Sequence, residues 1–172
     1  MNSDVSPTTD EPILPRLLAS NALRANLEKH MTLNKMADAK ASMVMTASSL
    51  IITVALAQFE NLALLTIVVL VTAGLISILL SILAIIPPWH VTDKTNLFYF
   101  RSFAELTEDE FVAVFKETIA SREKLYDAYL HEIYYLGKFR LTRKYALLRN
   151  GMVVLLIGLL LAAMASLGGK LF

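Results

Sequence analysis

Three long runs of uncharged, mostly apolar residues interrupt an otherwise polar chain of 172 residues. The first run covers 41–59 and the second 62–86, with only Glu60 and Asn61 between them; the third covers 151–169. A helix as long as the shortest run spans about 28 Å at 1.5 Å per residue, close to the ~30 Å hydrocarbon core of a bilayer. The pattern predicts a tight hairpin of two membrane helices and, after a long polar segment, a third membrane helix.

The polar segments predict helices outside the membrane. From Arg16 an apolar stripe recurs at helical spacing between charged residues. The hairpin should end at Pro87 and Pro88, because proline cannot continue a helix. Further along, Thr107 and Glu110 have the spacing of a capping box and predict the start of another helix. That helix would continue, with a candidate break at Gly137, through apolar residues at roughly helical spacing: Phe111, Phe115, Ile119, Leu125, Tyr129, Ile133 and Leu136. The "NLFYF" at 96–100 is a candidate strand, although an isolated strand forms no stable sheet.

These patterns predict an all-α membrane protein with three transmembrane helices. The expected divisions are a disordered tail (1–15), a cytoplasmic amphipathic helix (16–40), the transmembrane hairpin (41–86), a cytoplasmic helical sensor segment (87–149) and the last transmembrane helix (150–169). The apolar fraction of 56% exceeds the usual soluble range of about 45–50%.

Charge predicts the orientation. Five Lys or Arg residues precede the first run, none lies in the hairpin turn, and ten lie between the second and third runs. By the positive-inside rule both basic regions are cytoplasmic, so the N-terminus is inside and the C-terminus outside the membrane. The tail lacks the pattern of a secretory signal. A net charge of +1 gives no general attraction to nucleic acid.

A basic run before the third membrane helix is the main candidate for ligand binding. Arg140 and Lys144 are four residues apart and should share a helix face, while Arg143 lies to one side. This face could hold a phosphodiester anion while Tyr145 or Tyr135 stacks on a base. The alternative is attraction to anionic lipid, worth ~1 kcal/mol per basic residue near the surface.

Asp38 and Lys40 stand immediately before the first membrane run. One interpretation is that their side chains extend to the interface from the end of a helix. The other is a polar clamp against the basic end of the third membrane helix, which would couple the cytoplasmic segment to the membrane.

Several kinds of chemistry are not expected. The chain has no cysteine, and its three histidines, at positions 30, 90 and 131, lack the spacing of a metal site. No nucleophile elbow, phosphate-binding glycine loop or zinc-protease motif occurs, so an enzyme, a metal site and a bound cofactor are disfavoured. The membrane runs contain no ionisable side chain, which argues against a proton relay or an ion-coupled transporter.

Each membrane run carries small residues at four-residue spacing, a pattern that lets helices approach closely. They serve contacts within the bundle or between copies of the chain: Ser49, Thr53 and Ala57; Ala73, Ser77 and Ser81; Ala162 and Ser166.

The order of "ADAKASMVMTASSLIITVAL", "ISILLSILAIIPPW", "NLFYFRSFAELTEDEF" and "EKLYDAYLHEIYYLGKFRLTRKYALLR" before a last apolar helix resembles the transmembrane effector family of the bacterial Pycsar antiphage systems. The resemblance covers roughly 33–167. Its most specific parts are Asp38, Lys40, Ala41 and Ser42; Phe103 with Glu110; Tyr135 to Lys138; Lys144 and Tyr145; and Leu148 and Arg149.

The resemblance implies a two-gene defence. A partner cyclase would make cyclic CMP or cyclic UMP on infection, and this chain would respond by damaging the inner membrane in abortive infection. No stretch could build a β-roll, so a nucleotide pocket would have to be helical. The chain is also expected to form a homo-oligomer, in which two copies could share the pocket. Two alternatives stay open: a membrane-anchored adaptor that docks a protein partner through the helix from Glu108 to Leu136, and a small ligand-independent channel.

Overall fold

The computed structural model describes residues 13–86, 103 and 106–171. The elements are α1 (Ile13–Ala57), α2 (Leu64–Ile85), α4 (Glu108–Ala120), α5 (Arg122–Tyr135), the π-helix η1 (Leu136–Leu141) and α6 (Thr142–Leu171). The described ranges contain helices and no strand, which confirms the all-α prediction. The candidate strand at 96–100, the Pro-Pro-Trp at 87–89 and the tail up to residue 12 lie outside these ranges.

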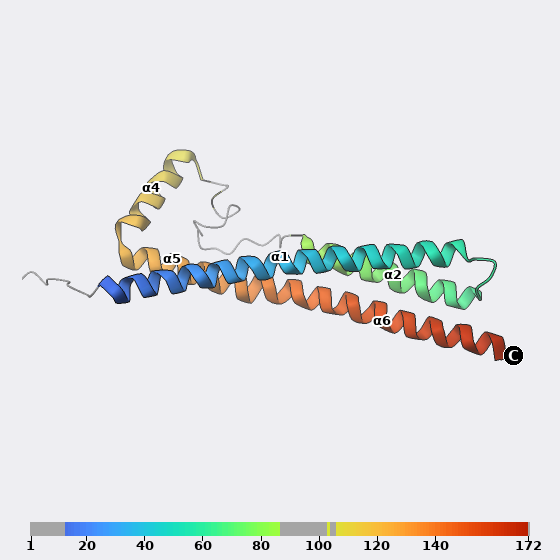
Figure 1. Ribbon diagram of the computed structural model, residues 1–172. Coiled ribbons are helices and arrows are strands. Elements are labelled where there is room, and N and C mark those ends of the chain that lie inside the picture. Colours follow the sequence, from blue (N-terminus) through green and yellow to red (C-terminus); the bar gives the residue numbers. More distant parts are fainter. Residues whose placement is uncertain (1–12, 87–102, 104–105, 172) are drawn as a thin grey trace, which may run out of the picture.

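Two long parallel rods form the frame of the molecule (Figure 1). The first is α1, whose 45 residues extend for about 68 Å and join the predicted cytoplasmic and membrane helices without interruption. The second consists of α5, η1 and α6, which follow one another directly. The rods contact each other from α5 to α6, so the segment expected to be cytoplasmic packs continuously into the membrane helices.

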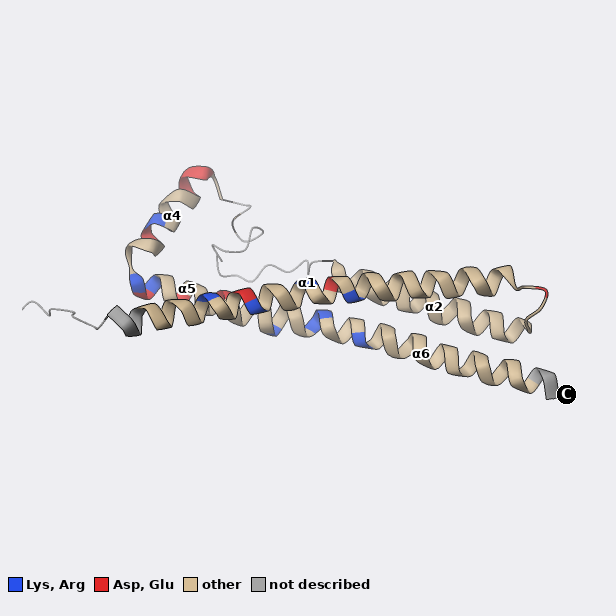
Figure 2. Ribbon diagram, viewed as in Figure 1, with Lys and Arg blue, Asp and Glu red and all other residues tan. Residues whose placement is uncertain are grey.

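The short helix α2 completes the membrane half of the molecule. It returns antiparallel after a turn at residues 58–63 and contacts both α1 and α6. It ends at Ile85, and Ile86 is extended, as expected of a residue before proline. Three described helices are long and apolar enough to cross a membrane, as predicted. Charged residues gather in the other half of the molecule and at the hairpin turn (Figure 2).

Small residues allow α2 and α6 to pack closely. Ala73, Ser77 and Ser81 are buried on α2, and Ala162 is buried on α6. A Cβ atom built on Gly158 would lie 2.2 Å from the Cβ of Ala73, so only glycine fits this crossing. The stripes predicted on α2 and around Ala162 therefore serve contacts within the bundle.

The predicted stripe on α1 behaves differently. Ser49, Thr53 and Ala57 are exposed on the bundle surface, and α1 instead buries Ser48 and Ala55. The buried positions are seven residues apart, which is two helical turns, so the sequence pattern identified the wrong face of α1 for the internal contact.

The helix that begins at Glu108 has the predicted start. Thr107 Oγ1 accepts a hydrogen bond from the Glu110 amide, and the Glu110 carboxylate accepts one from the Thr107 amide, which completes the capping box. The chain changes direction at Ser121 and not at the predicted break, Gly137. The Ser121 side chain caps α5 by accepting a hydrogen bond from the Lys124 amide. As a result α4 projects from the rods (Figure 1).

Candidate functional site

A polar contact joins the two rods where the charged half of the molecule meets the membrane half. Lys144 Nζ donates a hydrogen bond of 2.7 Å to Asn34 Oδ1 and lies 2.6 Å from Asp38 Oδ1. The second contact is an ion pair that lacks hydrogen-bond alignment. The Lys144 side chain is 11% exposed and that of Asp38 is 41% exposed, so solvent screens this pair only partly. The structure thus brings Asp38 against the basic end of the third membrane helix.

Tyr145 strengthens the same contact. Its hydroxyl donates a hydrogen bond of 3.1 Å to the Leu33 carbonyl of α1, and Lys40 Nζ lies 5.8 Å from the centre of its ring. Lys144 and Tyr145 both point toward α1, so the tyrosine is held by the rod contact and does not line the adjacent pocket.

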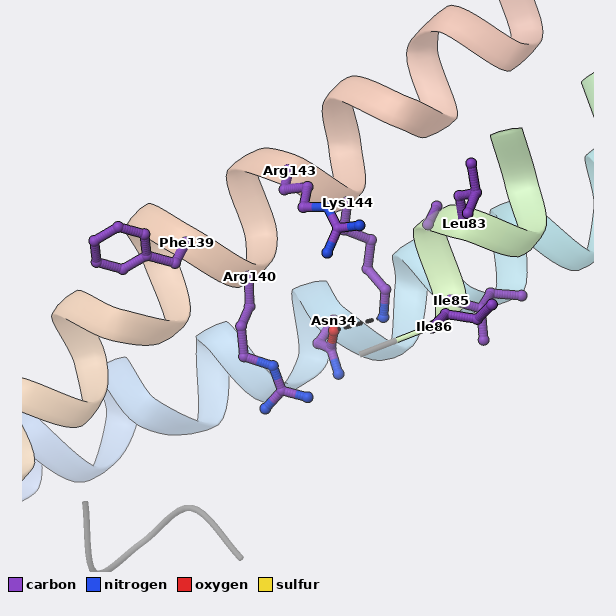
Figure 3. Close-up of a pocket in the computed structure, with 9 residues that line it drawn as sticks. Asn34, Leu83, Ile85, Ile86, Phe139, Arg140, Arg143 and Lys144 are labelled. Carbon is purple, nitrogen blue, oxygen red and sulfur yellow. Dashed lines mark hydrogen bonds between the residues drawn. The ribbon is translucent and has the colours of Figure 1, made fainter. Parts of the chain in front are cut away.

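A basic pocket lies beside this contact (Figure 3). It is shallow: its enclosed volume is about 20 Å³, far below the ~300–1,000 Å³ of ordinary ligand pockets, and the space of about 320 Å³ between its walls is partly open to solvent. One wall comes from η1 and α6, another from the end of α2, and the third from α1, so the pocket contacts every membrane helix. The lining residues are Asn34, Leu83, Ala84, Ile85, Ile86, Phe139, Arg140, Arg143 and Lys144.

The π-helix explains how one pocket collects the basic side chains. The Thr142 amide and hydroxyl both donate to the Gly137 carbonyl, five residues earlier, and this wider turn changes the register of the residues around it. Gly137 lies against His30 of α1, where an added Cβ would be 3.2 Å from His30 Nε2. Spacing on a regular α-helix had placed Arg143 to one side, but the structure puts it on the pocket wall with Arg140 and Lys144.

The aromatic ring on the pocket wall is Phe139, which the sequence did not single out. Phe139 also contacts Tyr135, with 5.6 Å between the ring centres. Its position four residues before Arg143 was the available signal. Asn34 gave no signal, because its role depends on a contact between residues 110 positions apart. Lys138 is not in the lining and packs on Tyr134 instead.

The chemistry of the pocket suits an anion that also has an apolar part. Arg140, Arg143 and Lys144 supply positive charge, and arginine can bind a phosphate with two hydrogen bonds. Phe139 and the isoleucines at the end of α2 supply apolar surface. Among the described residues no group of three His, Asp or Glu side chains could hold a metal ion.

Comparison with known protein families matches residues 22–169 to the Pycsar effector protein domain. Neither the curated proteins nor the solved structures contain a significant match to this chain. The matched residues include both rods, the hairpin and every residue that lines the pocket.

Proposed function

The chain belongs to the Pycsar effector family, which acts in cyclic-pyrimidine antiphage defence, and from this premise we propose that it is a non-enzymatic effector that impairs the bacterial inner membrane when it binds cyclic CMP or cyclic UMP. The nucleotide would come from a partner cyclase and act in abortive infection. The N-terminus and the basic pocket would face the cytoplasm, in accord with the distribution of Lys and Arg.

In this proposal the basic pocket receives the nucleotide. The cyclic phosphate carries one negative charge, which Arg140 and Arg143 would hold, and the pyrimidine would lie against Phe139. Because one chain forms only a small pocket, a second copy would close it. The cytoplasmic half of α1 exposes several large apolar side chains, which supports assembly into a homo-oligomer: Leu17, Leu18, Met31 and Met36.

The proposed mechanism rests on the two contacts that Lys144 makes at once. Lys144 lines the pocket and also closes the contact between α1 and α6 through Asp38 and Asn34. A bound phosphate and the Asp38 carboxylate would therefore compete for one ammonium group. Binding would weaken the contact between the rods and favour a different arrangement of the membrane helices. A mostly closed population becomes mostly open if the nucleotide prefers the open state by ~3–5 kcal/mol.

Titration calorimetry on the purified full-length chain tests the binding step. Substituting both arginines, Arg140→Gln with Arg143→Gln, should weaken binding of cyclic CMP or cyclic UMP by about a hundredfold, since two charge-assisted contacts are lost. Lys138→Gln is the matched control, because Lys138 lies on the same π-helix but outside the pocket lining. Equal affinity in the double variant and the control would refute this site.

One observation supports the adaptor alternative. The projecting helix α4 exposes Val112, Val114 and Ile119, which could dock a protein partner. Under that alternative, substituting these three residues by Ser would abolish the cellular response, and the purified wild-type chain would bind no nucleotide and cause no nucleotide-induced leakage from vesicles. Loss of leakage in the Arg140→Gln, Arg143→Gln variant favours the effector mechanism.

A further inference from the structure

Four hydroxyl groups are buried among the membrane helices. Ser48, Ser77 and Ser81 are 0% exposed and Thr66 is 3% exposed, and none of their side-chain oxygens has a hydrogen-bond partner within the described part of the chain. The hydroxyls of the exposed Thr46, Thr53 and Thr72 on the same helices each donate to a carbonyl one turn earlier.

Hydrogen bonding of the buried and exposed hydroxyls is the reverse of what most proteins show. Buried polar groups normally have partners, since an unpaired hydroxyl in an apolar surrounding loses its bonds to water without replacement. Here the hydroxyls on the outside are satisfied and those on the inside are not. The closed bundle therefore contains groups that water would stabilise.

Three of the four hydroxyls lie on the buried side of α2, in one seam of small residues. The seam consists of Thr66, Ala73, Ser77, Ser81 and Ala84, all buried. From first to last these positions extend for about 27 Å, which nearly equals the thickness of the bilayer core. The fourth hydroxyl is that of Ser48 in α1. The backbone carbonyl of Ser48 faces Gly74 of α2.

Glycines of α6 close this seam. A Cβ built on Gly151 would lie 3.4 Å from the Ser77 carbonyl oxygen and 3.6 Å from Ser81 Oγ, and Gly158 rests on Ala73. Leu80 of α2 also approaches Gly151, with its Cβ 3.5 Å from the built position, so the contact combines one leucine with small residues. Separation of α2 and α6 would consequently expose a wall made mainly of hydroxyls and small side chains.

We propose that the seam of α2, with Ser48 of α1, lines a water-filled path for small hydrated ions when α2 separates from α6. In the closed bundle α6 covers the seam, and entry of water on separation would satisfy the unpaired hydroxyls. The membrane runs have no ionisable side chain, so the path would discriminate little between ions.

The inference rests on the proposed function and identifies where membrane damage begins. Ala84 belongs both to the seam and to the lining of the basic pocket, and Lys144 lines another wall of the same pocket. A ligand that displaces Lys144 would therefore act at the cytoplasmic end of the seam.

Cysteine accessibility tests the path directly, because the natural chain has no cysteine. Full-length Ser77→Cys and Ser81→Cys variants are placed in vesicles of phosphatidylcholine and phosphatidylglycerol and treated with a charged methanethiosulfonate reagent. The matched control is Leu79→Cys, which lies between them on the same helix but is 56% exposed on the lipid side. Only a hydrated thiol reacts, so cyclic CMP or cyclic UMP should raise the modification rate about tenfold or more at positions 77 and 81 and leave position 79 unchanged.

Release of an enclosed dye is recorded in the same vesicles. Release without faster modification at positions 77 and 81, or with an equal rise at position 79, overturns the inference and leaves the proposed function standing. Equal modification at all three positions would indicate general disruption of the bilayer.

A second arm needs no nucleotide. Basal potassium flux is carried by the minor open population. It should fall about tenfold in the Ser77→Ala, Ser81→Ala variant, which lacks the hydroxyls that bind water along the path, and stay unchanged in Leu79→Ala. If neither nucleotide causes dye release, the proposed function fails and this arm decides the inference. Equal basal flux in the two variants, or no flux under any condition, overturns the ion path.

Discussion

At the scale of single residues, Lys144 connects the candidate binding pocket to the packing of the rods. Its ammonium group contacts Asn34 and Asp38 of α1 while its side chain lines the pocket. The sequence predicted a clamp of Asp38 and Lys40 against the basic end of the third membrane helix. It could not show that one lysine serves both the clamp and the pocket, since this depends on how two helices meet.

Asp38→Asn should make the protein more sensitive to nucleotide. The substitution removes the charge that competes with the ligand phosphate for Lys144, so the concentration of cyclic CMP or cyclic UMP that gives half-maximal dye release should fall about tenfold. Asp127→Asn, on the exposed surface of α5, is the matched control and should leave the dose response unchanged. A higher half-maximal concentration for Asp38→Asn would argue against competition at Lys144.

The capping box at Thr107 should make the start of α4 sensitive to acid. The backbone and side-chain hydrogen bonds from Thr107 hold the pKa of the Glu110 carboxyl below its ordinary value. A carboxyl with a lowered pKa in the folded state stabilises the helix at neutral pH, and this contribution is lost as pH falls from the ordinary value of the pKa through the lowered one.

Amide exchange at residues 108–111 measures this effect after correction for intrinsic rates. The wild type should lose protection over that acidic range, while Glu110→Gln should show a weaker dependence on pH because the amide cannot titrate. Parallel pH profiles for the two proteins would show that the Glu110 carboxylate does not stabilise the cap.

At the scale of helices, the sequence predicted those features that repeat along one element. The lengths of the apolar runs predicted the membrane helices, and the spacing of Thr107 and Glu110 predicted the start of α4. Three features depend on neighbours and were not predicted: the π-helix held against His30 at Gly137, the break at Ser121, and the outward face of the Ser49 stripe. Periodicity identifies which residues share a face, but tertiary contacts decide where that face points.

Gly158→Ala should destabilise the contact between α2 and α6. The added methyl group would overlap the Ala73 side chain, and overpacking of this kind costs about 1–3 kcal/mol. Gly168→Ala is the matched control on the same helix, because its added Cβ meets no atom within 4 Å.

Thermal unfolding in detergent compares the two variants. Gly158→Ala should melt several degrees below the wild type, and Gly168→Ala should melt at or slightly above it, since alanine favours the helix. Equal melting temperatures would indicate that α2 and α6 do not approach closely in the folded protein.

At the scale of the whole molecule, two parallel rods connect the basic pocket to the membrane helices. Every membrane helix contributes to that pocket, so a ligand there contacts the whole bundle. The fold class and the order of segments could be predicted from hydrophobic runs and charge. The pocket could not, because Asn34, Ile85 and Phe139 come from three separate stretches of sequence that only the fold brings together.

The distribution of Lys and Arg predicts a single orientation of the rods in the membrane. Cysteines introduced at Glu60 and Glu123 should react with an impermeant thiol reagent from opposite sides of intact cells, the first from outside and the second only after the membrane is opened. Labelling of position 123 from outside would place the pocket on the wrong side for a cytosolic messenger.

The central claim is that a cyclic pyrimidine nucleotide in the basic pocket opens the membrane. Dye release from vesicles that contain the full-length chain tests it most directly, with nucleotide added on the side of the pocket. We predict release with cyclic CMP or cyclic UMP but not cyclic AMP, retained in Lys138→Gln and lost in the Arg140→Gln, Arg143→Gln variant. Equal release by the wild type and the double-arginine variant, or no release with either pyrimidine nucleotide, would contradict the claim.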